Sequence, residues 1–160
     1  MIERILDIGD LSKSHLRAWE ALVRSHGALI KVISARMDAE CCIGLATYEV
    51  LLSLEQAPHQ RLTMGELAGI VILSPSGVTR LVDRLEKQGL VAREVNPNDK
   101  RSFHTVLTEA GLKEREKAWP VFRAGIRESF VAHMSEAEAD ELTECLLKFV
   151  KKGIGAAVHL

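Results

Sequence analysis

Two short segments of this sequence carry the residues best suited to contact a polyanion. The first begins at Ser74-Pro75 and offers small polar side chains followed by arginines, and the second is the run NPNDKR at residues 96–101. Hydroxyl side chains at the first turn of a helix can approach base edges and phosphates, and an arginine fork can bind guanine through two hydrogen bonds. The candidate contact residues are Ser74, Ser76, Gly77, Thr79, Arg80, Arg84, Lys87, Asp99, Lys100 and Arg101.

The first segment suggests a different task for each of its residues. Arg80 is the candidate for reading a guanine in the major groove, with Thr79 against a base or a thymine methyl group. Gly77 allows close approach of the backbone, and the start of a helix favours a bound phosphate. Arg84 and Lys87 lie further along and are expected to meet phosphates, which position a protein on DNA without reading its sequence.

The second segment is a basic tip. Arg101 has the character of an arginine that enters a narrow minor groove, and Asp99 would hold its guanidinium in place. Residues 61–107 contain seven basic and five acidic side chains, a local charge of +2 in a chain of net charge −1, so the rest of the chain carries −3. Positive charge is therefore concentrated locally, and the molecule as a whole is not a general binder of polyanions.

Caps and turns predict the elements that hold these two segments. Thr63 and Glu66 form the signature of a capping box, and Ser74-Pro75 provides an N-cap followed by proline at the first helical position. Gly89 is expected to end this second helix. Two short helices joined by a tight turn form a helix-turn-helix. The runs LVAREV and SFHTVL flank the turn-forming residues NPND, so a β-hairpin, or wing, is expected next.

Amphipathic helices are predicted on both sides of this unit. Apolar residues at three- and four-residue spacing predict a helix over about residues 11–38. Thr108 should cap another that runs to about residue 132, with Pro120 kinking or breaking it, and Ser135 opens a last helix through a second capping box. A long apolar stripe near a terminus has little to pack on within a small domain, so we expect it to pair with a second chain.

Composition excludes several classes of protein. The chain has 160 residues and no apolar run of about 18 residues, so no membrane span is expected. Its first residues lack a signal-peptide core, which favours a cytoplasmic location. The three cysteines do not form a disulfide framework, although the adjacent Cys41 and Cys42 are a candidate redox pair. No metal-site spacing, phosphate loop or nucleophile elbow is present, so we expect no metal, no cofactor and no enzymatic activity.

The segments LSPSGVTRLVDRLEKQGLV and NPNDKR, the latter followed by LTEAG, closely resemble the winged helix of the multiple-antibiotic-resistance regulator (MarR) family. The resemblance extends over nearly all of the chain. It implies a mostly α-helical fold with a small β-hairpin, in which a winged helix-turn-helix is flanked by dimerisation helices. One domain would span residues 1–160, with a DNA-binding region at 45–107 and a helical dimerisation region at 11–44 and 108–160.

The resemblance also implies an obligate homodimer that binds a pseudo-palindromic operator in double-stranded DNA. Asp99 and Arg101 match an aspartate and an arginine of the family's DNA-reading wing. The sequence departs from the family pattern at Asn96 and Lys100, where an aspartate and a second arginine are usual.

A small anionic or phenolic effector is the last implication of this resemblance. Such ligands bind between the dimerisation helices and the winged domain, where apolar walls with a few polar anchors form a pocket. The candidate pocket residues are His15, Trp19, His26, Tyr48, Glu49, Trp119 and Arg123. Trp19 also lies on the apolar stripe of the first helix, where packing explains it as well.

Two functions from different classes remain open at this point. The first is a transcriptional regulator, expected to be a ligand-responsive repressor that acts as a homodimer. The alternative is a winged-helix module that binds another protein through its wing. Arginine at both Arg80 and Arg101 favours the first, because a protein contact has no particular need for arginine in both places.

Overall fold

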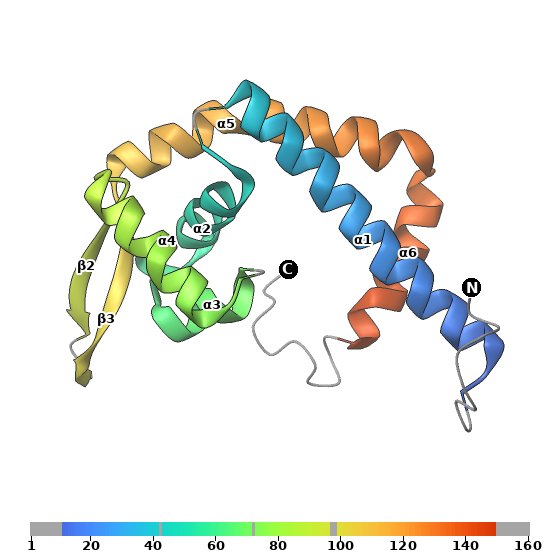
Figure 1. Cartoon of the computed structure of the whole chain (residues 1–160), viewed down its shortest axis with the longest axis horizontal. Helices are drawn as coiled ribbons and strands as arrows, with labels where there is room; N and C mark the ends of the chain where they lie inside the picture. The colour runs from blue at the N-terminus through green and yellow to red at the C-terminus, as the bar shows by residue number, and fades with distance from the viewer. Residues whose placement is uncertain (1–10, 42, 72, 97–98, 150–160) are drawn as a thin grey trace.

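The computed structural model describes residues 11–41, 43–71, 73–96 and 99–149. Within them, a small winged-helix unit is joined to an extended arm of long helices (Figure 1). The arm contains α1 (Lys13–Glu40), α5 (Glu109–Ser129) and α6 (Glu136–Phe149). The winged-helix unit contains α2 (Leu45–Gln56), β1 (Arg61–Thr63), α3 (Met64–Ile70), α4 (Pro75–Lys87), β2 (Val91–Asn96) and β3 (Asp99–Leu107). The predicted fold class, mostly α-helical with a small β-hairpin, is confirmed.

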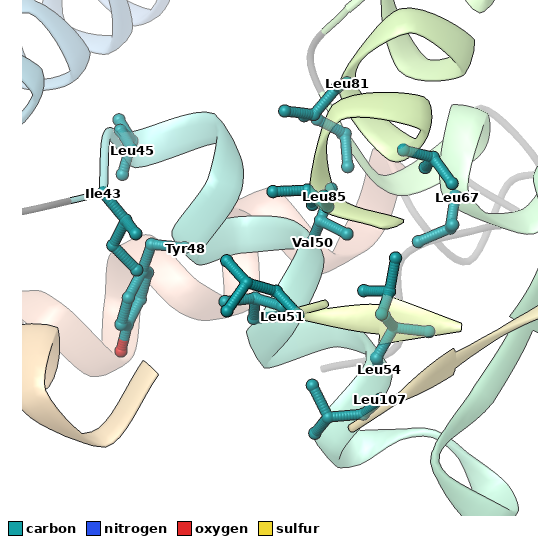
Figure 2. Packing of buried hydrophobic residues seen from close by; sticks show 14 of the residues in the cluster. Ile43, Leu45, Tyr48, Val50, Leu51, Leu54, Leu67, Leu81, Leu85 and Leu107 are labelled. Atoms are coloured by element: carbon teal, nitrogen blue, oxygen red, sulfur yellow. The ribbon is translucent and has the colours of Figure 1, made fainter. Parts of the chain in front are cut away.

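Helix α2 forms the centre of the hydrophobic core. Its residues Val50 and Leu54 are fully buried, and Leu67 of α3 and Leu85 of α4 are buried against the same cluster. Figure 2 shows these side chains converging with Leu107 at the end of β3. Burial of apolar surface therefore fixes α3 and α4 onto a common support, and the outer face of α4 is left to solvent.

The predicted helix caps are present. Glu66 N donates to Thr63 Oγ1 at 3.3 Å while Thr63 N donates to Glu66 Oε2 at 2.7 Å, which completes the capping box of α3. The Ser74 hydroxyl accepts from Gly77 N at 3.2 Å and caps α4. Gly89 follows α4 with a φ of 72°, a backbone conformation that favours glycine.

The sheet contains a strand that the sequence did not predict. β1 pairs antiparallel with β3, with Arg61 opposite Val106, and the strand order is β1-β3-β2. A segment of three residues is too short to show an alternating pattern, so nothing in the sequence distinguishes it from a loop. Strands β2 and β3 form the hairpin that we call the wing, residues 91–107.

The long helices differ from their predicted bounds. Helix α1 begins at Lys13, because Ser12 caps it by accepting from His15 N at 3.2 Å, and it continues to Glu40. Helix α5 ends at Ser129, earlier than expected, and a 3₁₀ turn follows it.

The sequence predicted that Pro120 would kink or break the helix, and of these two outcomes the break is wrong. Helix α5 is continuous from Glu109 to Ser129, and Figure 1 shows it arching along its length. Proline removes one backbone hydrogen bond, to the carbonyl four residues earlier. Glu116 and Pro120 are both exposed, so water can satisfy that carbonyl and the helix curves without breaking.

The arm exposes much of its apolar surface in a single protomer. Helix α1 buries only Ile33 and Met37, and α6 buries no residue at all. The exposed apolar residues of the arm include Trp19, Leu22, Val23, Val32, Leu146 and Phe149, and Leu11 just before α1 is exposed as well. Across the described residues no single helix is long and apolar enough to span a membrane, although the bent pair of α3 and α4 passes the same test of length and composition when taken together.

Candidate nucleic-acid interface

Helix α4 presents a polar, basic face to solvent. Its inner side is fixed by the buried residues Val78, Leu81, Val82 and Leu85, as the sequence predicted. The helical period then places the remaining residues outside, and the exposed residues that follow Pro75 are Ser76, Thr79, Arg80, Arg84 and Lys87. All five were predicted as contact residues, and the structure brings them to one surface.

Two of these side chains lie back along the helix. Thr79 Oγ1 donates to the Pro75 carbonyl at 3.1 Å, and Arg80 Nε donates to the Ser76 carbonyl at 3.3 Å. These bonds occupy one donor of each side chain. The Arg80 guanidinium has five N–H donors, so four remain for a base or phosphate.

Gly77 has a structural role that the sequence analysis did not anticipate. A Cβ atom at this position would lie 3.2 Å from the Ser74 hydroxyl and 3.4 Å from Leu73 Cβ. The first of these contacts would crowd the side chain that caps α4. Glycine therefore preserves the cap, and through it the direction in which α4 begins.

The wing extends beyond the body of the winged-helix unit (Figure 1). Asp99, Lys100 and Arg101 lie on β3, but their side chains are outside the part of the chain that the structure describes. Nearer the body, Val95 and Phe103 are cross-strand partners and are 57% and 46% exposed. Two apolar side chains are therefore exposed side by side on the hairpin.

Arg93 on β2 connects the wing to α4. Its Nη1 lies 3.0 Å from Glu86 Oε2, and its Nη2 donates to Asp83 Oδ1. Asp83 and Glu86 are the two acidic residues of α4, three positions apart and therefore on one face. Sequence reasoning included Arg93 in the local positive charge and did not predict its partners, because that requires the position of β2 relative to α4.

A second ion pair lies on the opposite side of β2. Glu94 Oε2 is 3.2 Å from Arg61 Nη1 on β1, so it reaches across the central strand. Side chains of neighbouring strand residues point to opposite faces. The base of the wing is thus held to α4 on one face and to the edge strand on the other.

Comparison with known proteins identifies the family. The MarR family model matches residues 43–103. An uncharacterized HTH-type transcriptional regulator of Bacillus cereus is 33% identical over 106 residues, covering 66% of this chain and 69% of that protein. The crystal structure of Sco3205, a MarR family transcriptional regulator from Streptomyces coelicolor in complex with DNA, has 25% identity and a TM-score of 0.77 over 92% of both chains. The chain belongs to the MarR family.

Other curated relatives are matched over a smaller share of their own length. The transcriptional repressor MprA of Escherichia coli is 28% identical over 105 residues, which is 66% of this chain and 59% of MprA. Across the first four curated relatives, the matched segment spans 53–59% of the relative's length. These proteins are regulators of transcription, which agrees with the prediction that this MarR-family chain is not an enzyme.

The structure divides the predicted effector residues into groups. Tyr48 of α2 is fully buried, with its ring centroid 4.4 Å from that of Phe122, and Trp119 lies 6.2 Å from the same ring. Burial raises the pKa of the Tyr48 hydroxyl, and the charge of Arg115 partly opposes this shift. Tyr48 therefore contributes to the core, while Trp119 remains 41% exposed at the edge of this aromatic group.

Glu49 and His26 form a second group, between α2 and α1. Glu49 is half-buried, and this burial raises the pKa of its carboxyl, while the charge of His26 lowers it. His15 lies eleven residues before His26, which is about 16 Å along α1 at the usual helical rise. A small ligand in one protomer cannot touch both. Trp19 and Arg123 are exposed, so a pocket containing the whole predicted set would need walls from a second chain.

The remaining candidates have simple placements. Cys41 is half-buried at the C-terminal end of α1, where its N–H donates to the Met37 carbonyl at 2.8 Å. Cys42 lies outside the described residues. Within the described residues no group of three or more histidine, cysteine, aspartate or glutamate side chains is arranged to hold a metal ion.

Proposed function

We propose that this protein is a homodimeric transcriptional regulator that binds a pseudo-palindromic operator in double-stranded DNA. In this proposal α4 enters the major groove and the wing contacts the adjacent minor groove. The observation that carries it is the outer face of α4, where hydroxyl, arginine and lysine side chains are exposed together over a rigidly buried inner face. The DNA complex of the similarly folded Sco3205 supports it.

The dimer would be formed by the arm. Its exposed apolar residues lie on α1 and α6, which pack little apolar surface within the protomer. Two winged-helix units must lie about 34–36 Å apart to reach successive major grooves. A paired arm would set that spacing, so dimerisation and operator binding would depend on each other.

We further propose a small anionic or phenolic effector that acts on this spacing. The half-buried Glu49 lies beside His26 where α2 meets α1, and Trp119 lies at the exposed edge of the aromatic group around Phe122. Trp19, exposed on α1, would complete the pocket from a second chain. A ligand bound there would weaken operator binding by favouring another spacing. A typical coupling free energy of about 1–3 kcal/mol corresponds to roughly a 5–150-fold loss of affinity. The protein would then act as a repressor in the cytoplasm.

A mobility-shift titration tests the proposal. The purified protein is added to duplex DNA that flanks its own coding region, and to a random-sequence library, over a series of salt concentrations. We expect selective binding whose log affinity falls linearly with log salt, because phosphate contacts release counterions. Weak and unselective binding to the whole library would contradict operator recognition.

Charge reversal identifies the contact surface. Arg101→Glu should abolish operator binding without dissociating the dimer, and Arg80→Ala should cost about 1–3 kcal/mol and relax specificity at one base pair per half-site. Arg127→Glu, an equal charge reversal on the exposed last turn of α5, is the matched control and should bind as the wild type does.

The exposed pair of Val95 and Phe103 favours a second candidate, a wing that binds another protein. Unchanged DNA binding by Arg101→Glu together with lost binding of a partner by Phe103→Ser would establish it in place of operator binding by the wing.

A further inference from the structure

We infer that Arg93 is a positioning residue that fixes the angle between the wing and α4. It thereby sets which base pairs the wing reads next to those that α4 contacts in the major groove. The inference rests on the proposed DNA-binding function and assigns a role to a residue that does not itself lie on the outer face of α4. It also explains why two acidic residues, Asp83 and Glu86, lie on α4.

The acidic residues of α4 are at first sight unfavourable. Asp83 and Glu86 lie on the helix that would approach a polyanion, beside Arg80, Arg84 and Lys87. A carboxylate near phosphates lowers the affinity for DNA, because like charges repel. Both carboxylates are, however, bonded to the same guanidinium, and their side chains are only 44% and 38% exposed. Their partner Arg93 offsets one of their two charges and holds both carboxylates against β2.

The geometry suits a rigid connection. A guanidinium is planar and presents its N–H donors in a fixed fork, so two carboxylates on adjacent donors define its orientation. Arg93 Nη1 binds Glu86 at 3.0 Å and Nη2 binds Asp83, so the fork spans nearly one turn of α4. One bond would allow the strand to pivot about it, and two bonds prevent this.

Contacts on both faces of the wing complete the arrangement. Opposite Arg93 on β3 is Thr105, which is buried and whose hydroxyl lies 3.7 Å from Met64 Sδ at the start of α3. On the reverse face, Glu94 is paired with Arg61 of β1 at 3.2 Å. The base of the wing is therefore tied to α3, α4 and β1, whereas Val95 and Phe103 beyond it are exposed. These contacts at the base therefore set the direction in which the outer part of the wing, around Val95 and Phe103, extends.

The direction of the change in DNA affinity when an acid of α4 is neutralised distinguishes a positioning role from a simple effect of charge. Asp83→Asn and Glu86→Gln each remove a negative charge next to the proposed DNA surface. If charge alone mattered, both variants would bind DNA more tightly. If the acids position the wing through Arg93, both variants bind more weakly, by roughly 5–150-fold, the range for the loss of one well-placed contact. Glu109→Gln, on the first turn of α5 and 82% exposed, is the control for removal of an acid elsewhere.

The experiment uses the full-length protein and a duplex that the wild type selects from a random-sequence library. Affinities of the wild type, Asp83→Asn, Glu86→Gln, Arg93→Gln and the control are measured by fluorescence anisotropy. Each is repeated with the flanking base pairs, those next to the major-groove half-sites, replaced. We expect Asp83→Asn, Glu86→Gln and Arg93→Gln to bind more weakly and to discriminate less between the original and the replaced flanking base pairs. Their unfolding temperatures should be close to that of the wild type.

Tighter or unchanged binding by Asp83→Asn and Glu86→Gln would overturn the inference, as would weaker binding with full discrimination between flanks. Should Arg93→Gln fail to fold, the two acid variants give the same answer, and the exchanged pair Asp83→Arg with Arg93→Asp should restore discrimination relative to Arg93→Asp alone. Failure of the wild type to select any duplex would instead contradict the proposed DNA-binding function.

Discussion

Replacing Gly111 with alanine tests how α5 is attached to the winged-helix unit. Gly111 is buried in the first turn of α5, where Thr108 caps the helix by accepting from Gly111 N at 3.0 Å. A Cβ atom on Gly111 would lie 2.1 Å from the Leu90 carbonyl oxygen and 2.9 Å from Leu107 Cδ1. The first of these is a backbone atom, so it cannot move away by a change of rotamer.

Two effects of opposite sign decide the magnitude. Alanine is a better helix former than glycine, which would stabilise the protein by about 1 kcal/mol. Relieving the clash, however, requires α5 to shift by about 1 Å away from Leu90, the usual consequence of overpacking, at a cost of about 1–3 kcal/mol. The shift also stretches the bond from the Thr108 hydroxyl to the Leu90 carbonyl, now 2.9 Å, and a lost hydrogen bond costs about 1 kcal/mol. We expect a net loss of roughly 1–3 kcal/mol in the free energy of unfolding.

Equilibrium unfolding in urea at one fixed protein concentration measures this loss. The midpoint of Gly111→Ala should fall while the slope stays the same, because the surface exposed on unfolding is unchanged. Gly65→Ala is the matched control, since its Cβ would meet only Thr63 Oγ1 at 4.0 Å. It should be neutral or slightly stabilising. If Gly111→Ala is as stable as Gly65→Ala, the close approach of α5 to Leu90 is not a feature of the molecule in solution.

Three further predictions concern charge, backbone strain and pairing. Because burial raises the pKa of Glu49 in the folded protein, the native state binds more protons than the unfolded chain between the two pKa values, and stability is lost as the pH rises through that window. Glu49→Gln should therefore stabilise the protein at neutral pH and much less in acid, as followed by thermal unfolding; an equal effect at both would exclude a raised pKa. His59 has a φ of 56°, in the left-handed region, so His59→Gly should raise the free energy of unfolding by about 0.5–1 kcal/mol in urea titrations, and a decrease would show that its side chain has a stabilising role. Trp19, 66% exposed in one protomer, should be covered in a dimer, so Trp19→Glu should shift the mass measured by light scattering from dimer toward monomer, and an unchanged mass would remove Trp19 from the interface.

Much of this fold could be predicted because its signals are local. The capping boxes at Thr63 and Ser135, the N-cap at Ser74 and the left-handed Gly89 each depend on residues within a few positions of one another. The outer face of α4 was predicted for the same reason, since four buried residues at helical spacing fix which side is exposed. The MarR-family resemblance, confirmed by the comparisons, rests on those same segments.

The placements that depend on distant residues were not predictable. The three residues of β1 form a strand only because β3, more than forty positions later, offers a free edge. Pro120 lies on the solvent-exposed side of a continuous α5, a placement that the sequence does not reveal. Likewise the predicted effector residues divide between a buried aromatic group and the neighbourhood of Glu49, a separation set by how α1 and α5 pack.

The sequence by itself determined the order of the helices and the hairpin, their caps, the exposed polar face of α4 and the family. Only the tertiary structure decided that Arg93 reaches Asp83 and Glu86, that Gly111 must lack a side chain, and that the arm leaves apolar surface uncovered. The physical reason is range. Helix caps and helical faces arise from bonds and periodicities within one or two turns, whereas an ion pair between a strand and a helix, or a backbone passing within contact distance, exists only once the hydrophobic core has fixed the elements against each other.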